Sequence, residues 1–410
     1  MRQGTTSPIV TAVTEGSPPN TSGPGLYNRG MLGPDDAARY HRMQLYLGLA
    51  GFALSLGYLL VVLASGFSAQ LTLILSVVSD AWWAQVAMVA AVLGAGQMLV
   101  GLPLRVVRGF WLPRRFGLLH QPLTGWLADG AKAAALGGVL GLGGVLVVYG
   151  LLRATAWWWL IAAAVFFVAG IALAALFPVL IVPLFYRLTR LNDPALEGRL
   201  LALAGRAGVV AIGVWVVDQS RKSRTANAAV VGLGRTRRII LFDTLATAFR
   251  EEEVEAVLAH ELGHHVHGDL RRGLLVQGAL TLVTFWLASR LLAAGVPYWN
   301  LEGVADPAGL PWLALVLMLL GTVQMPLANG FSRWIERQAD DFALALTRDP
   351  GAFIGAMERL GTLNLAERRP HRLKEILLYS HPALDRRIAR ARGGEEGNPP
   401  RMPLPKGGNA

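Results

Sequence analysis

Six long apolar stretches dominate this sequence and restrict the folds that it can adopt. Each is close to the ~20 residues that an α-helix needs to cross the hydrocarbon core of a bilayer. They cover residues 45–65, 82–104, 131–151, 157–181, 274–296 and 310–328. We expect each to form a transmembrane helix, since a helix satisfies its own backbone hydrogen bonds in lipid. The last stretch is the weakest, because Gln324 and Pro326 interrupt it, and a buried helix of a water-soluble domain is the alternative there.

The composition agrees with a membrane protein and excludes several chemistries. With 53% hydrophobic and 16% charged residues, the chain is too apolar for ordinary soluble domains. It contains no cysteine, which excludes disulfides, thiolate ligands and cysteine nucleophiles. A net charge of +11 also occurs in nucleic-acid-binding proteins, but here the basic residues flank the apolar stretches instead of forming one patch. We therefore expect membrane lipid, and no nucleic acid, as a partner.

Positive charge is distributed unevenly among the segments that connect the apolar stretches. Arginine is frequent before the first stretch, between the second and third, in residues 183–272 and in the C-terminal segment. Residues 66–81 and 297–309 contain no Lys or Arg, and Arg153 is the exception on that side. Positively charged loops stay in the cytoplasm, so both termini and the large hydrophilic segment are predicted there. High Arg and Ala content with few Lys is typical of a GC-rich bacterial gene, so a bacterial plasma membrane is expected.

The hydrophilic segment contains the motif H-E-x-x-H, from His260 to His264. A helix is predicted over residues 251–267, because three glutamates occupy its first turn and apolar residues follow at helical spacing. Residues four apart share a helix face, so His260 and His264 can bind one metal ion with Glu261 beside it. In zinc proteases such histidines are ligands and the glutamate acts as general base. A solvated surface helix is the alternative for so short a motif.

A third ligand is expected in FSRWIERQADDFALAL, residues 331–346. One face of the predicted helix is apolar, and Arg333, Glu336 and Asp340 form a second, polar row at positions i, i+3 and i+7. Glu336 can supply a carboxylate ligand, and Asp340 can accept the other ring N–H of a ligand histidine. Arg333, in the same row, is expected beside the metal site together with Asp340. The alternative is an amphipathic helix with an internal salt bridge.

Two further histidines follow the motif. His265 lies about 100° round the helix from His264, so it cannot reach the same metal ion. His267 shares the face of the two candidate ligands but lies one turn further along, where a cationic imidazole suits the helix dipole. We expect neither to be a ligand.

Several motifs, in order, resemble the membrane-embedded zinc metalloproteases of the Ste24 type, the CAAX prenyl protease 1 family, which belongs with the HtpX-like proteases. The resemblance covers roughly residues 102–388. Its motifs are LPLRVVRGFWLPRRFGLLHQPLTGW (102–126), FPVLIVPLFYRLTRLND (177–193), SRTANAAVVGLGRTRRIILFDTL (223–245), LAHELGHH (258–265), SRWIERQADDFA (332–343) and YSHPALDRRI (379–388). The family often has a second proline after S-H-P, where this chain has Ala383.

The resemblance implies a metal centre with one Zn²⁺ per chain. His260, His264 and Glu336 would be the ligands, and Glu261 would be the general base. His381 would stabilise the oxyanion or the substrate carbonyl, a role for which histidine is chemically suited. The alternative for His381 is a histidine that only precedes a helix.

The resemblance also implies a substrate-binding edge strand that contains Asn227 and Ala228 and pairs with the peptide backbone. The residues support a β-structure there, because residues 228–231 and 238–242 are β-prone and a glycine-rich turn separates them. The alternative for Asn227 is a turn residue.

The expected fold is mainly α, a polytopic membrane protein with a zincin-like α+β catalytic domain that contains a small β-sheet. The expected parts are a disordered tail (1–38), four transmembrane helices (39–182), a catalytic segment with the H-E-x-x-H helix (183–270), a transmembrane hairpin (271–330), a second catalytic segment (331–392) and a disordered tail (393–410). The segment between His264 and Glu336 is therefore mostly a hairpin in the membrane. This connection places the metal close to the cytoplasmic membrane surface.

The expected function is hydrolysis of peptide bonds in membrane-associated proteins or peptides, whose C-terminal part is hydrophobic or lipidated. Quality control of membrane proteins and CAAX-type processing of prenylated C-termini are both open alternatives. An intramembrane protease of the site-2 type is disfavoured, because charged residues flank the motif on both sides. An inactive membrane scaffold is also disfavoured, because Glu261 and all three candidate ligands are present.

Overall fold

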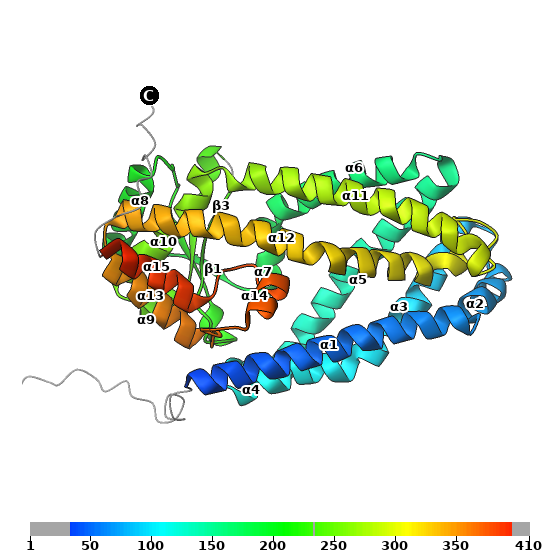
Figure 1. Ribbon diagram of the computed structural model, residues 1–410, viewed down its shortest axis with the longest axis horizontal. Helices are drawn as coiled ribbons and strands as arrows, with labels where there is room; N and C mark the ends of the chain where they lie inside the picture. The colour runs from blue at the N-terminus through cyan, green and yellow to red at the C-terminus, as the bar shows by residue number, and fades with distance from the viewer. Residues whose placement is uncertain (1–32, 233, 396–410) are drawn as a thin grey trace, which may run out of the picture.

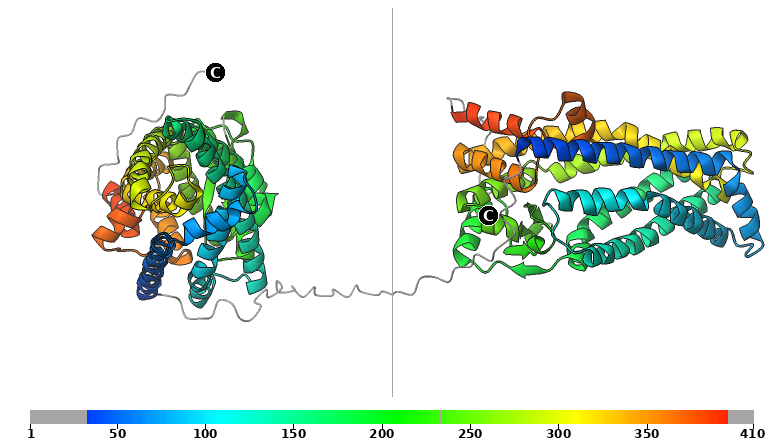
Figure 2. Two further views of the ribbon diagram at one scale, coloured as in Figure 1. Left: turned by 90° about the vertical axis from the view of Figure 1, so that its right-hand side faces the viewer. Right: turned by 90° about the horizontal axis from the view of Figure 1, so that it is seen from below.

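Helices make up most of the structure, a computed structural model that describes residues 33–232 and 234–395 (Figure 1). Most of the two tails expected to be disordered, residues 1–32 and 396–410, lies outside the described residues. The described chain is an elongated bundle of helices with a small sheet and shorter helices gathered at one end (Figures 1 and 2). The predicted fold class, mainly α with a small β-sheet, is confirmed.

The first and last described helices extend further than predicted. Helix α1 (Pro34–Ala64) includes residues 34–38, and helix α15 (Leu384–Glu395) includes residues 393–395, all of which were assigned to the tails. Helix α1 begins early because proline suits the first helical position and the two aspartates after it favour the first turn.

Among the described residues, six helices are long and apolar enough to cross a membrane. They are α1, α3 (Trp82–Val106), α5 (Leu123–Ala154), α6 (Trp158–Leu176), α11 (Asp269–Tyr298) and α12 (Leu310–Thr347). Each corresponds to one predicted apolar stretch. Helices α3 and α6 continue through π-helical turns, η1 (Val107–Trp111) and η2 (Phe177–Ile181), into α4 (Leu112–Arg115) and α7 (Val182–Phe185). The short apolar helix α2 (Phe67–Ser76) joins α1 to α3.

The weakest predicted span lies within α12, which continues through Gln324 and Pro326. The Gln324 Nε2 donates to Thr284 Oγ1 of α11 at 2.7 Å and to the Leu280 carbonyl at 3.3 Å. These hydrogen bonds satisfy the amide inside the bundle, as polar side chains between membrane helices generally do. The stretch is therefore a candidate span and not a helix of a soluble domain.

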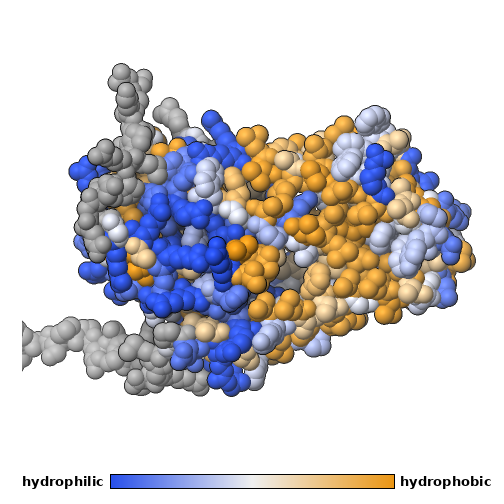
Figure 3. Space-filling model, in the orientation of Figure 1, coloured by the Kyte–Doolittle hydropathy of each residue, from blue (hydrophilic) through white to orange (hydrophobic). Residues whose placement is uncertain are grey.

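The outer surface of the bundle is apolar, whereas the end that carries the sheet is mostly hydrophilic (Figure 3). Large apolar side chains such as Val61, Val168, Leu275 and Val323 are exposed along the spanning helices. A water-soluble protein rarely exposes so large an apolar area, and a bilayer provides the matching environment.

The described residues form a four-stranded sheet in the order β1-β2-β4-β3. Its strands are β1 (Leu188–Arg190), β2 (Val214–Val217), β3 (Ala228–Val231) and β4 (Arg238–Phe242). Strand β3 is antiparallel to β4 and lies at the edge of this sheet, whereas β2 is parallel to β4. The two strands predicted from the sequence are thus confirmed with their bounds.

Helix α10 (Glu251–Val266) packs against the C-terminal half of α12. The two helices approach closely at Gly263, where an added Cβ would lie 3.1 Å from the Ala339 Cα. Only glycine permits this distance without a shift of the backbone. Around the contact lies a buried core to which the sheet and the helices α8 (Pro194–Arg206), α9 (Asp243–Ala248), α13 (Pro350–Leu363) and α15 contribute. The crossing brings the H-E-x-x-H motif of α10 to the polar row of α12.

Candidate metal centre

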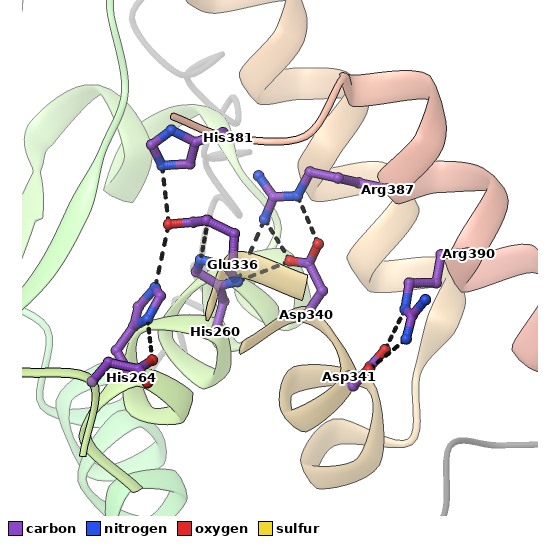
Figure 4. Close-up of polar contacts among 9 residues, drawn as sticks. His260, His264, Glu336, Asp340, Asp341, His381, Arg387 and Arg390 are labelled. Atoms are coloured by element: carbon purple, nitrogen blue, oxygen red, sulfur yellow. Dashed lines mark hydrogen bonds and ion pairs between the residues drawn. The ribbon is translucent and has the colours of Figure 1, made fainter. Parts of the chain in front are cut away.

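Three side chains from the two crossing helices converge on one point (Figure 4). In the described part of the chain, ligand atoms of His260, His264 and Glu336 lie within 4.8 Å of one another. The Glu336 Oε2 is 3.3 Å from His260 Nε2, and its Oε1 is 3.6 Å from His264 Nε2. The two imidazole rings are almost perpendicular, with centroids 4.9 Å apart. The structure therefore brings together the three residues predicted as ligands.

The chemistry of this cluster fits a zinc ion. The Glu336 Oε2 is buried and, among the described residues, has no hydrogen-bond partner of suitable geometry. In this cluster a carboxylate oxygen and two ring nitrogens face one another without hydrogen bonds. Ligands around a shared cation are arranged in the same way. Two histidines and one glutamate are also a common protein ligand set of catalytic zinc.

Each candidate ligand histidine uses its second ring nitrogen to contact a carboxylate. The His260 Nδ1 lies 2.9 Å from Asp340 Oδ1, which is the contact predicted from the sequence. The His264 Nδ1 lies 2.9 Å from Asp269 Oδ2. Such contacts fix the tautomer, so that the remaining nitrogen would present its lone pair to a bound metal ion. Burial lowers the pKa of His260, but the carboxylates of Asp340 and Glu336 outweigh burial and raise it, so the surroundings of this histidine favour a positive charge such as that of a metal ion.

Sequence reasoning missed two members of this network and misplaced one. Asp269 is the first residue of α11, and its distance of five residues from His264 was the available signal. Arg387 of α15 donates to both carboxylate oxygens of Asp340, at 2.6 and 2.9 Å. Arg333 was expected beside the metal site, but its guanidinium donates to the backbone carbonyls of Glu375 and Tyr379. Its side chain is long enough to leave the polar row of α12 altogether.

Glu261 lies on α10 between the two candidate ligands and is partly buried. Burial raises the pKa of its carboxyl above the ordinary value, although the neighbouring histidines act in the opposite direction. A raised pKa makes the carboxylate a better proton acceptor near neutral pH. These properties suit a general base.

His381 reaches the cluster from the loop between α14 (Arg372–Leu378) and α15 (Figure 4). Its Nε2 lies 3.2 Å from Glu336 Oε1, and its Nδ1 lies 2.9 Å from Ser380 Oγ. The side chain is 58% exposed, so a substrate can reach it. His381 is thus a candidate hydrogen-bond donor beside the metal site.

The free edge of β3 presents backbone groups next to α10. The Asn227 carbonyl accepts from Phe242 N of β4 at 2.9 Å, so the alternate residues Ala228 and Val230 direct their N–H and C=O groups away from β4. Ala228 N donates to Asn227 Oδ1, and the Val230 carbonyl accepts from His265 Nε2 at 3.0 Å. His265 therefore connects α10 to the edge strand. The ring of His267 packs against Phe342 instead of pointing into the cluster.

Replacement of Arg387 by methionine is expected to weaken metal binding and to destabilise the fold. Asp340 is almost fully buried, so loss of its guanidinium partner leaves a buried charge that costs about 3 kcal/mol. Arg387 also holds the Asp340 carboxylate that contacts His260, so the loss of Arg387 should weaken zinc binding about tenfold. Thermal unfolding in detergent and competition with a zinc indicator measure the two effects.

The matched control for this variant is Arg390→Met. Arg390 makes a similar bidentate pair with Asp341, one residue further along α12, and Asp341 does not contact a candidate ligand. The control should keep the zinc affinity of the unmodified protein. Equal zinc affinities for the two variants would contradict a role of Arg387 in orienting His260.

The bundle and the site together define a class of protein, the membrane-embedded metalloproteases. The family described as Peptidase family M48 matches residues 190–395, which is half of the chain. A second family, described as CAAX prenyl protease N-terminal, five membrane helices, matches residues 35–187. That region holds four candidate spans and the short apolar helix α2. The chain belongs to peptidase family M48, and it is an integral-membrane metalloprotease.

Curated relatives and a solved structure are similar over most of the chain. The uncharacterized metalloprotease YhfN of Bacillus subtilis is 29% identical over 311 residues, covering 73% of this chain and 71% of YhfN. The CAAX prenyl protease 1 of Saccharomyces cerevisiae is 28% identical over 318 residues, covering 72% and 70%. The crystal structure of S. mikatae Ste24p matches with a TM-score of 0.77 at 24% identity and covers 87% of this chain and 88% of that one. At this identity the structural match shows the fold alone.

Proposed function

We propose that this protein is a zinc-dependent endopeptidase with one Zn²⁺ per chain, held by His260, His264 and Glu336. The observation that carries the proposal is the convergence of these three ligands from two crossing helices, with an unbonded carboxylate oxygen facing a ring nitrogen. Bound there, zinc supplies a Lewis acid that lowers the pKa of water and polarises the peptide carbonyl.

The residues around the cluster supply the general base, the hydrogen bond to the substrate carbonyl and the groups that orient the ligands. Glu261 accepts a proton from the attacking water and delivers it to the leaving amine, a general acid–base role that its raised pKa supports. His381 donates a hydrogen bond to the carbonyl oxygen as negative charge develops on it. Asp340 and Asp269 hold the two imidazoles in the required tautomers.

The peptide backbone binds along the free edge of β3, by addition of a strand to the sheet. Ala228 and Val230 direct their backbone groups to that edge. Asn227 fixes the start of the strand, because its carbonyl bonds to β4 and its Oδ1 accepts from Ala228 N. Asn227 Oδ1 occupies the Ala228 N–H and His265 occupies the Val230 carbonyl, so the paired stretch of substrate is short and uses the Ala228 carbonyl and the Val230 N–H between them.

The substrates are membrane-associated proteins or peptides with a hydrophobic or lipidated C-terminal part. The apolar exterior of the bundle restricts the protein to a membrane, and α11 and α12 connect the two catalytic segments, residues 183–270 and 331–392, through it. The distribution of arginine supports a location of both termini and the active site on the cytoplasmic side of a bacterial plasma membrane. Two candidate functions therefore remain for this protein, namely membrane quality control and the processing of prenylated C-termini. The second is suggested by the relatives that are named CAAX prenyl proteases.

Removal of the metal tests this proposal. Treatment of the purified, detergent-solubilised protein with 1,10-phenanthroline should abolish cleavage of a fluorogenic hydrophobic peptide, because the ligand set then holds no Lewis acid. Added Zn²⁺ should restore cleavage, whereas Mg²⁺ should not, since magnesium prefers oxygen ligands. The non-chelating isomer 1,7-phenanthroline is the control. Full cleavage by chelated protein that contains no metal would refute the proposal.

A further inference from the structure

A strongly basic cavity lies beside Asp340, separate from the point on which the metal ligands converge. Its volume is about 370 Å³. Among the residues that the structure describes, its arginines are Arg333, Arg337, Arg372, Arg386, Arg387 and Arg390. They come from α12, α14 and α15, so three elements distant in the sequence assemble this concentration of positive charge.

Protein carboxylates compensate only part of the positive charge of the cavity, and Arg390 is paired with Asp341. Its acidic lining residues are Asp340 and Glu375, and each already pairs with an arginine, Arg387 and Arg386 respectively. Arg337 and Arg372 are exposed, and their guanidinium groups have no hydrogen-bond or ion-pair partner within residues 33–232 and 234–395. Two free guanidinium groups at one cavity are donors for a bound anion, since arginine binds phosphate in a bidentate manner.

An exposed apolar surface adjoins the cavity on α14. Leu373, Ile376, Leu377 and Leu378 are all exposed, with Leu373 at 61%. Ile376 also lines the cavity, so the apolar surface and the arginines are continuous. An ordinary soluble surface does not place four large apolar side chains on one short helix.

The position of α14 along α12 places this surface at the edge of the membrane. The Asn329 Nδ2 of α12 donates to the Leu377 carbonyl at 2.9 Å. On the span side of this contact, Val323 and Leu327 are exposed, as lipid-facing residues are. On the other side lie the exposed Trp334, a residue type that favours the headgroup region, and then Arg337. The apolar surface of the bundle gives way to hydrophilic surface at the level of α14 (Figure 3).

We propose that this cavity binds the phosphate headgroup of an anionic phospholipid, whose acyl chains lie against the apolar face of α14. The arginines supply the positive charge that such a headgroup attracts at the cytoplasmic membrane surface. An amphiphile of this kind satisfies both halves of the surface at once, whereas a free anion leaves Leu373 and Leu377 exposed to water. The bound lipid holds α14, and with it the loop that carries His381, at a fixed depth in the membrane.

Lipid titration of the purified full-length protein tests the proposal. Dioleoylphosphatidylglycerol is added to the protein in a nonionic detergent, and bound lipid is counted by native mass spectrometry. The unmodified protein should bind one phosphatidylglycerol more tightly than phosphatidylcholine. The double variant Arg337→Gln/Arg372→Gln should weaken that binding about tenfold or more, because each arginine near a membrane surface contributes separately. Arg372→Gln alone, on a short exposed helix, should show part of the loss even where the double variant folds poorly.

The matched control is Arg39→Gln/Arg42→Gln, which removes the same charge from exposed positions at the start of α1. This control should bind phosphatidylglycerol like the unmodified protein. Equal losses in both double variants, or equal affinities for the two lipids, would overturn the proposal. Inorganic phosphate that displaces the lipid at comparable concentrations would assign the cavity to a free anion instead. None of these results depends on peptide cleavage, so they test the lipid site separately from the proposed catalysis.

Discussion

Replacement of Glu261 by glutamine is expected to reduce peptide cleavage roughly a thousandfold while one zinc ion per chain is retained. Glutamine has nearly the same shape as glutamate, but it cannot accept a proton from water. The three candidate ligands are untouched, so the metal should stay bound. Cleavage of a fluorogenic peptide and zinc content by elemental analysis measure the two quantities on one preparation.

The control for Glu261→Gln is Glu252→Gln, the same substitution in the first turn of the same helix. Glu252 is about half exposed, and among the described residues its ion-pair partner is Arg199 of α8. It should keep full activity. Glu261→Gln protein that cleaves at the unmodified rate would contradict the assignment of the general base.

The inactive variant should also retain uncleaved native substrates in its own membrane. Identification of these proteins separates quality control from CAAX-type processing.

The elements of the fold were predictable where a short-range pattern determines them. Strands β3 and β4 follow from two β-prone runs around a glycine-rich turn, and α10 follows from its acidic first turn and helical apolar spacing. The six apolar stretches predicted the six candidate spans because length and composition are sufficient for that purpose. The early start of α1 was missed, although Pro34 and the aspartates after it are also a local signal.

The contacts between distant segments were only partly predictable. The contact between His260 and Asp340 was predicted from the polar row of α12. Glu336 and Asp340 are four residues apart, so they share the helix face that meets the histidines. The pairing of Arg387 with Asp340 joins residues on two helices whose relative placement depends on packing, and no local pattern encodes it. The bond from His265 to Val230 likewise depends on where α10 meets the sheet. Arginine side chains are also flexible, so the direction taken by Arg333 could not be read from its position on α12.

The length of α12 explains how one chain combines a membrane span with a metal ligand. Its apolar first half contacts α11 in the bundle, and its second half carries Glu336 and Asp340 into the catalytic core. The position of this helix in the membrane therefore determines where the metal site lies relative to the membrane. Because Glu336 is the ligand that α12 brings to the site, its loss should weaken metal binding most directly.

Replacement of Glu336 by alanine is expected to weaken zinc binding by more than about 100-fold, the upper end of the effect seen when an outer partner of a ligand is lost. The change removes one of three ligands and leaves His260 and His264 on α10. Asp341→Asn, on the same helix and outside the cluster, should bind zinc normally. Zinc affinity by indicator competition distinguishes the two variants.

His381 offers another nitrogen that can replace Glu336 as a ligand, because its Nε2 lies 3.2 Å from Glu336 Oε1. Unchanged zinc affinity in Glu336→Ala would therefore contradict the assignment of the third ligand. In that case Glu336→Ala/His381→Ala should lose the metal while His381→Ala alone keeps it. If both single variants bind zinc normally and the double variant does too, the two histidines of α10 hold the metal without either residue, and the convergence of the three side chains has another cause.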